Sequence, residues 1–155
     1  MIINFSDEQP NLSKEKKSIF LAGPTVRNSK FILSWRKNAC DILQNLGFDG
    51  IVYVPEFKES NNPMEFLEQA GWERQCLKNA DVIVFYLCRE FPEIPGLTTN
   101  VEYGMWLVKK PDACLLCSPK QYNKNRYLDW LYTQEKPNSV IYKDLESVLE
   151  AAIEL

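Results

Sequence analysis

The sequence predicts a single α/β domain with a mostly parallel sheet of five strands. Two observations predict it. Short apolar runs of strand length alternate with longer helical stretches along the chain, and this alternation is typical of βαβ units. The length of 155 residues, of which 45% are hydrophobic, suits one domain with a sizeable core.

The first half of the chain contains two predicted strands and two predicted helices. The strands are predicted over residues 18–22 and 50–54, and the helices over 30–46 and 63–78. The first helix repeats apolar side chains every three or four residues, and Gly47 is placed to end it as a C′ glycine. Pro55 ends the second strand, and Pro63 lies near the first turn of the second helix, where proline is tolerated.

The second half adds three strands and three helices. The strands are predicted over 81–87, 113–117 and 139–142, and the helices over 99–109, 123–134 and the residues after Asp144. The run 81–87 is apolar after its first residue, as expected for a central parallel strand covered on both faces. Asp144 can cap the last helix, whose apolar residues form one stripe.

Right-handed connections between these strands favour a flavodoxin-like three-layer sandwich. In such sheets ligands bind beyond the carboxyl ends of the strands, where the strand order reverses. We expect the loop after the first strand and the segment leading into Glu102 to meet there. Polar and charged residues dominate the first 16 positions, which predicts a flexible arm over 1–16 before a single domain over 17–155.

The composition excludes several classes of function. The chain has no histidine, which excludes Ser-His-Asp and Cys-His catalysis and histidine-ligated zinc, so acid–base chemistry falls to other side chains. A net charge of −3 without a basic cluster argues against a nucleic-acid polymer as partner. Apolar runs far shorter than a membrane span, and an N-terminus without a signal-peptide pattern, predict a cytoplasmic protein with no membrane partner.

The five cysteines are scattered and odd in number, which argues against a disulfide framework. Cys114 and Cys117 form a CxxC pattern inside an apolar run. Without a second cysteine pair or a histidine, a buried strand is favoured over a redox or zinc site. We expect no metal and no other cofactor.

Glu102 has two interpretations on local grounds. Thr99 and Glu102 have the spacing of a capping box, in which the glutamate only satisfies a backbone N–H at the helix start. The expected place of the segment at the strand-order reversal favours a role in chemistry instead. Gly104 costs ~1 kcal/mol relative to alanine inside a helix, which indicates a close approach by a bulky group.

Three other segments are candidates for a site, each with a plainer alternative. The loop 23–27 could hold an anion or a sugar hydroxyl on its backbone N–H groups, or be an ordinary turn. Glu73 is either a second carboxylate at the site or part of a solvated helix face, whereas Asp81 suits a structural cap. Asn125 could contact a base or a neighbouring subunit, or cap a helix.

Taken together, these segments resemble the nucleoside 2-deoxyribosyltransferase-like family. The residues that carry the resemblance are, in the family's order, Ile19 to Pro24, Trp72 and Glu73, Asn79 to Asp81 with the strand that follows, and Val101 to Gly104. The resemblance implies a flavodoxin-like fold and cleavage of the N-glycosidic bond of a 2′-deoxynucleoside or its 5′-monophosphate. It also implies a homo-oligomer, a dimer or higher, in which a neighbouring subunit completes each site.

The resemblance also assigns roles to individual residues. In the family's transferases a glutamate at the position of Glu102 attacks the anomeric carbon and forms a covalent deoxyribosyl-enzyme, and related members hydrolyse deoxynucleoside monophosphates. A carboxylate nucleophile suits a chain without histidine, and Glu73 aligns with the base-contacting acid. The remaining expected substrate-binding residues are Phe20, Gly23, Pro24, Thr25, Arg27, Glu93, Thr99 and Asn125, the last in place of an asparagine supplied by the adjacent subunit.

The approach to the nucleophile departs from the family pattern. The transferases carry an aspartate a few residues before the nucleophile, whereas the nearest acid here is the more distant Glu93. The base-facing acid is a glutamate rather than an aspartate. These differences keep open a second class of function, a nucleotide-binding or sensor module that retains the pocket without turnover.

Overall fold

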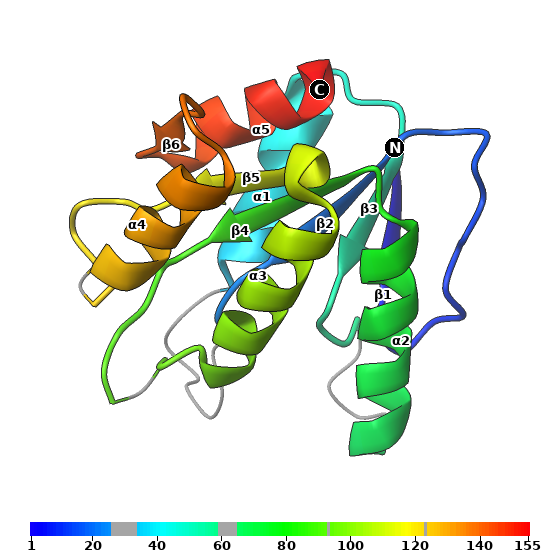
Figure 1. The fold of residues 1–155 in the computed structure, drawn as a ribbon. Coiled ribbons are helices and arrows are strands. Elements are labelled where there is room, and N and C mark those ends of the chain that lie inside the picture. Colours follow the sequence, from blue (N-terminus) through cyan, green and yellow to red (C-terminus); the bar gives the residue numbers. More distant parts are fainter. Residues whose placement is uncertain (26–33, 59–64, 93, 123) are drawn as a thin grey trace.

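The computed structural model describes residues 1–25, 34–58, 65–92, 94–122 and 124–155. Within these ranges six strands form one parallel sheet in the order β1-β3-β2-β4-β5-β6 (Figure 1). The strands are β1 Ile2–Phe5, β2 Ser18–Ala22, β3 Ile51–Val54, β4 Val82–Tyr86, β5 Cys114–Cys117 and β6 Ile141–Tyr142. Without β1, this is the flavodoxin-like order, in which the second strand lies outside the first.

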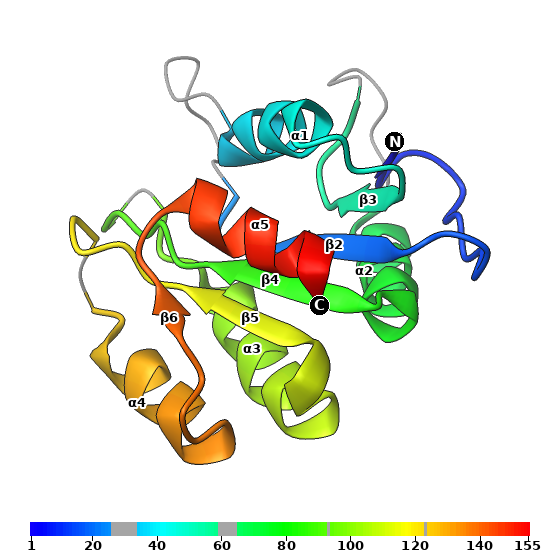
Figure 2. The ribbon, with the colours of Figure 1, turned by 90° about the horizontal axis from the view of Figure 1, so that it is seen from above.

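Helices cover both faces of the sheet. They are α1 Trp35–Asn45, α2 Phe66–Asn79, α3 Leu97–Lys109, α4 Arg126–Glu135 and α5 Leu145–Glu154, with a 3₁₀ turn at Pro111–Ala113. Figure 2 shows α1 and α5 on one face and α2, α3 and α4 on the other, each face with its own apolar core. The predicted three-layer sandwich is therefore confirmed. In the described part of the chain, none of the helices has the length and apolar character needed to cross a membrane.

Residues 1–16 differ from the flexible arm that the sequence predicts. Ile2–Phe5 pairs in parallel with β3, in register from Ile2 opposite Ile51 to Phe5 opposite Val54. The Asn4 side chain then holds the turn that follows, because its Nδ2 donates to the carbonyl of Gln9 and its Oδ1 accepts from the N–H of Asn11. The polar residues thus satisfy backbone groups at a sheet edge, and β1 adds a sixth strand to the five predicted.

Several local predictions are confirmed. Gly47 follows α1 with a left-handed φ of 75°, and its N–H donates to the carbonyl of Gln44. Asp144 caps α5 by accepting from the N–H of Ser147. Cys114 and Cys117 lie in the buried strand β5, where burial raises the pKa of both thiols to about 12. The helix starts predicted at residues 30 and 63 lie outside the described residues.

The start of α3 corrects the capping-box prediction. The helix begins at Leu97, with Gly96 as N-cap at φ 62° and no side-chain cap hydrogen bond. Thr99 therefore lies inside the first turn, and Glu102 lies in the second turn, away from the free N–H groups of the helix start. The close approach expected at Gly104 is also absent among the described residues, because a Cβ there would meet nothing within 4 Å.

Candidate active site

The strand order reverses between β2 and β4, which pair directly in the middle of the sheet. Their carboxyl ends approach closely at Gly23, where a Cβ would lie 2.5 Å from the carbonyl oxygen of Tyr86. The loop after β2 then reaches the start of α3, since a Cβ on Gly96 would lie 2.8 Å from Cγ of Pro24. The two segments expected to meet at the reversal point therefore do so, and glycines make both contacts possible.

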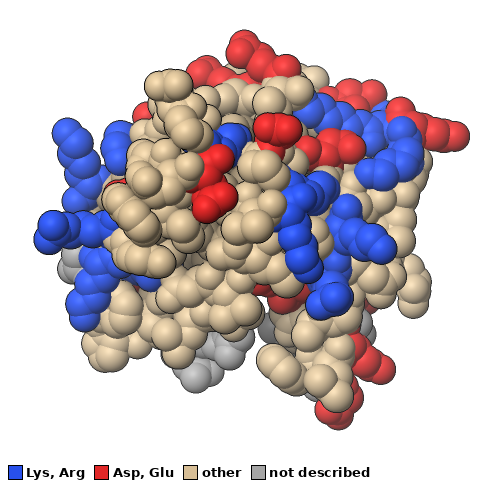
Figure 3. Space-filling model, in the orientation of Figure 1, with Lys and Arg blue, Asp and Glu red and all other residues tan. Residues whose placement is uncertain are grey.

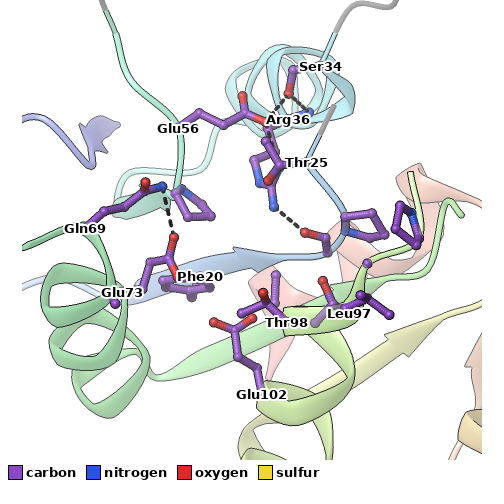
Figure 4. A pocket seen from close by; sticks show the side chains of 18 of the residues that line it. Phe20, Thr25, Ser34, Arg36, Glu56, Gln69, Glu73, Leu97, Thr98 and Glu102 are labelled. Atoms are coloured by element: carbon purple, nitrogen blue, oxygen red, sulfur yellow. Dashed lines mark hydrogen bonds and ion pairs between the residues drawn. The ribbon is translucent and has the colours of Figure 1, made fainter. Parts of the chain in front are cut away.

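A pocket of about 750 Å³ opens at this edge of the sheet, a volume typical of small-molecule sites (Figure 4). It is walled by the ends of β2 and β3, the start of α1, and the facing sides of α2 and α3. Most of the residues predicted from the sequence line it, namely Phe20, Gly23, Pro24, Thr25, Glu73, Thr99 and Glu102.

The other three predicted site residues are Arg27, Glu93 and Asn125. Arg27 and Glu93 lie outside the described residues. Asn125 is described and only 4% exposed, and its Nδ2 donates to the carbonyl of Leu87 at 3.0 Å. It occupies the N-cap position of α4 without making a side-chain cap bond. An asparagine offered to a neighbouring subunit needs an accessible amide, so the structure does not support that role for Asn125.

Two carboxylates point into the pocket from different helices. Figure 4 shows Glu73 of α2 and Glu102 of α3 on either side of the Phe20 ring, which comes from β2. Burial and then the negative charge of Glu73 raise the pKa of Glu102 to about 7, whereas the positive charge of Arg36 lowers it. Glu102 is therefore a desolvated, charge-coupled carboxyl, which is typical of functional sites.

Gln69 fixes the position of Glu73. It lies one turn earlier on α2 and donates from Nε2 to Oε1 of Glu73 at 3.1 Å (Figure 4). The alternative that Glu73 belongs to a solvated face is thus wrong, because both side chains line the pocket. The neighbouring Trp72 is a core residue. Asp81 is structural, as expected, since its carboxylate accepts from the N–H and hydroxyl of Ser18.

An ion pair that the sequence analysis missed lies at the opposite wall. The Arg36 guanidinium, 1% exposed, lies 2.7 Å from Oε1 of Glu56, and the same oxygen accepts from the hydroxyl of Ser34 at 2.8 Å. Ser34 also caps α1 by accepting from the N–H of Arg36. The available signal was an arginine inside the apolar stripe of a predicted helix, because buried arginines are almost always paired.

The charges at the pocket are predominantly negative. Among its described lining residues the charged groups are Glu56, Glu73, Glu102 and Arg36. The side chains that the structure describes contain no group of three or more potential ligands that could hold a metal ion. The lining contains two interacting carboxylates, Glu73 and Glu102, beside the Phe20 ring. Such a pair is suited to acid–base and nucleophilic chemistry.

Comparison with known proteins places the chain in a family. A family model described as nucleoside 2-deoxyribosyltransferase like matches residues 16–122, a stretch that includes β2, β3, α2 and α3 and hence every wall of the pocket. No protein of curated function matches the chain. Because the family match covers well over half of the chain, the protein belongs to the nucleoside 2-deoxyribosyltransferase-like family.

Proposed function

We propose that the protein cleaves the N-glycosidic bond of a 2′-deoxynucleoside or its 5′-monophosphate through a covalent deoxyribosyl–Glu102 intermediate. The observation that carries the proposal is the pair Glu102 and Glu73, which point into one pocket at the strand-order reversal of a chain without histidine. The family membership supports the substrate class. The pocket volume of about 750 Å³ supports a ligand of nucleoside size.

The first step uses the form of the pair in which Glu102 is ionised and the proton that the two carboxyls share lies on Glu73. Ionised Glu102 attacks C1′, so that an ester bond forms while the bond from C1′ to the base nitrogen breaks and its electron pair leaves with the base. Protonated Glu73 gives its proton to the departing nitrogen, and the base leaves neutral. Phe20 offers an apolar surface beside both carboxyls, and Gln69 holds Glu73 toward the base.

The second step reverses these roles. A water molecule or a second base attacks C1′ from the face that the first base left, and the ester bond to Glu102 breaks. Glu73, now ionised, takes the proton of the attacking group. Two displacements at C1′ retain its configuration, as in glycosidases that use a carboxylate nucleophile. Water as acceptor gives hydrolysis, and a base gives transfer.

The raised pKa of Glu102 fits this mechanism at neutral pH. A carboxyl with a pKa of about 7 is ionised in roughly half of the molecules at pH 7. The same desolvation that raises the pKa makes the carboxylate more basic than an exposed one. The ionised form of Glu102 is therefore both available and reactive under physiological conditions.

We further propose that the protein forms a homo-oligomer through α3. Leu97, Val101 and Val108 are 70%, 71% and 62% exposed and lie along one side of this helix. Figure 3 shows a largely uncharged surface over the N-terminal half of α3, and exposed apolar patches of this kind mark interaction sites. Leu97 also lines the pocket, so a second copy on this surface would border the site.

Chromatography tests the reaction. The protein is incubated with each natural deoxynucleoside and each 5′-monophosphate, with and without a free acceptor base, and Glu102→Ala serves as control. We expect base release or base exchange that the variant lacks. No release and no exchange on any of these compounds would contradict the proposal. Ligand-induced shifts in melting temperature without product would instead favour a nucleotide-binding module.

A further inference from the structure

Arg36 connects three segments of the site from a buried position in the first turn of α1. Its Nε donates to the carbonyl of Leu21 at 2.9 Å and its Nη2 to the carbonyl of Gly23 at 2.7 Å. Its Nη1 donates to the hydroxyl of Thr25 at 3.2 Å and to Glu56 at 2.7 Å. One guanidinium thus joins the end of β2, the loop after it and the end of β3.

These contacts argue against Arg36 as a ligand-binding group. Its side chain is 1% exposed, and each of its three nitrogens already donates to an acceptor of the protein. A buried arginine is tolerated only when it is paired and hydrogen-bonded in this way. Four of its five N–H groups are thus engaged by acceptors in the pocket wall, so its role is structural within the site.

The loop that Arg36 holds packs against the start of α3, the helix that carries Glu102. Pro24 lies between Gly23 and Thr25, and its ring packs against Gly96, the N-cap of α3. The indole Nε1 of Trp35 donates to the carbonyl of Pro24 at 3.1 Å, so α1 fixes this residue through a second bond. A shift of the loop would therefore be transmitted to the first turns of α3, where Glu102 lies.

Arg36 also acts on Glu102 through its charge. The charged groups that act on Glu102 are Glu73 on α2, which raises its pKa, and Arg36 on α1, which lowers it. Glu56, the remaining charged residue of the described lining, is held in the ion pair with Arg36. Among the described lining residues Arg36 is the one cation, so it supplies the positive charge that offsets the carboxylates.

We propose that Arg36 is a positioning residue for Glu102, which holds the loop Gly23–Thr25 against the start of α3 and stabilises the ionised nucleophile. The inference rests on the proposed function of Glu102. Arg36 makes two separate contributions to the site. The hydrogen bonds of the guanidinium set the geometry of the pocket wall, and its charge favours the carboxylate form of Glu102.

The test compares Arg36→Gln, Arg36→Lys and the control Lys37→Gln, which removes a charge from the exposed neighbour on the same helix. In Arg36→Gln we expect kcat to fall about 10- to 100-fold, the loss typical of a misplaced reactive group. We also expect its activity to begin at higher pH than in the unaltered protein. Arg36→Lys should lose kcat but keep the pH profile, and Lys37→Gln should keep both.

A titration of the Glu102 carboxyl by ¹³C NMR, assigned through Glu102→Gln, separates this inference from the proposed function. It needs no turnover. A higher pKa of Glu102 in Arg36→Gln supports the inference even if no nucleoside reacts. An unchanged pKa together with an unchanged kcat in folded Arg36→Gln overturns it. If Arg36→Gln does not fold, Arg36→Lys decides, and an unchanged kcat there overturns the positioning role.

Discussion

Glu73 and Glu102 act on each other across the pocket from two different helices, α2 and α3. Both helices cover the same face of the sheet and flank the ends of β2 and β4, so the fold brings together carboxyls that are far apart in the chain (Figures 1 and 2). Like charges in a desolvated pocket disfavour double ionisation. The pair therefore shares one proton over part of the pH range, and the proposed reaction uses the form in which Glu73 carries that proton.

Glu73→Gln should change the pH profile as well as the rate. Removal of its negative charge lowers the pKa of Glu102, so the acid side of the kcat profile should move to lower pH. Loss of the proton donor should reduce kcat by about 10²- to 10⁴-fold. Glu68→Gln, on the same helix but outside the pocket, is the control. An acid limb that does not move in Glu73→Gln would contradict the coupling.

Glu102→Gln should stabilise the protein at pH 8. The pKa of Glu102 is raised from 4.5 to about 7 in the folded state, so the folded protein binds this proton more tightly than the unfolded chain does. Stability is therefore lost as pH rises from about 4.5 to about 7. Because Glu102 keeps some exposure to solvent, which screens part of its charge, we expect a gain of about 1–2 kcal/mol. Urea unfolding at pH 8 and pH 4 measures it, and equal effects at both pH values would argue against the raised pKa.

Gly96→Ala should weaken both stability and activity. Its φ of 62° is strained for alanine, and the new Cβ would lie 2.8 Å from Cγ of Pro24. We expect a loss of about 1–3 kcal/mol and a lower kcat, because the start of α3 must shift. Gly71→Ala is the matched control, since a Cβ there meets nothing within 4 Å and alanine favours the helix by about 0.5–1 kcal/mol. Thermal unfolding should show a lower stability for Gly96→Ala and a higher one for Gly71→Ala. A Gly96→Ala variant as stable as the unaltered protein would contradict the packing role of Gly96.

Val101→Glu should dissociate the proposed oligomer. Val101 is 71% exposed in the middle of the apolar stripe on α3, and a charge buried between two copies would be unpaired. Sedimentation velocity should show an oligomer for the unaltered protein and a smaller species for the variant. Val140→Glu adds the same charge at another exposed valine, next to β6, and should leave the oligomer intact. A protein that sediments as a monomer at all concentrations would rule out the interface.

The architecture follows from the sequence because the buried strands from β2 to β5 are short apolar runs separated by helices of clear periodicity. Strand β1 was missed because it precedes a long polar segment, so that residues 1–16 as a whole have the composition of a flexible arm. The start of α3 was misplaced because Gly96 caps it through backbone conformation, with none of the side chains that signal an N-cap.

The candidate site was predictable where its position follows from the sheet topology or from the family resemblance. Glu102, Glu73 and the loop after β2 follow from the topology of a parallel sheet and the family resemblance. Arg36 and Glu56 were not found, because an arginine in an apolar stripe predicts a buried partner without naming it, and the partner lies at the end of a distant strand. Asn125 was assigned by family position, but its burial against Leu87 follows from tertiary packing alone.

Intact-protein mass spectrometry after mixing with a deoxynucleoside tests the nucleophile most directly. The proposed mechanism predicts a mass increase of one deoxyribosyl group, which disappears on addition of an acceptor base and is absent in Glu102→Ala. Base release that proceeds without any adduct in rapidly quenched samples, or an adduct that persists in folded Glu102→Ala, would contradict the assignment of Glu102 as the nucleophile.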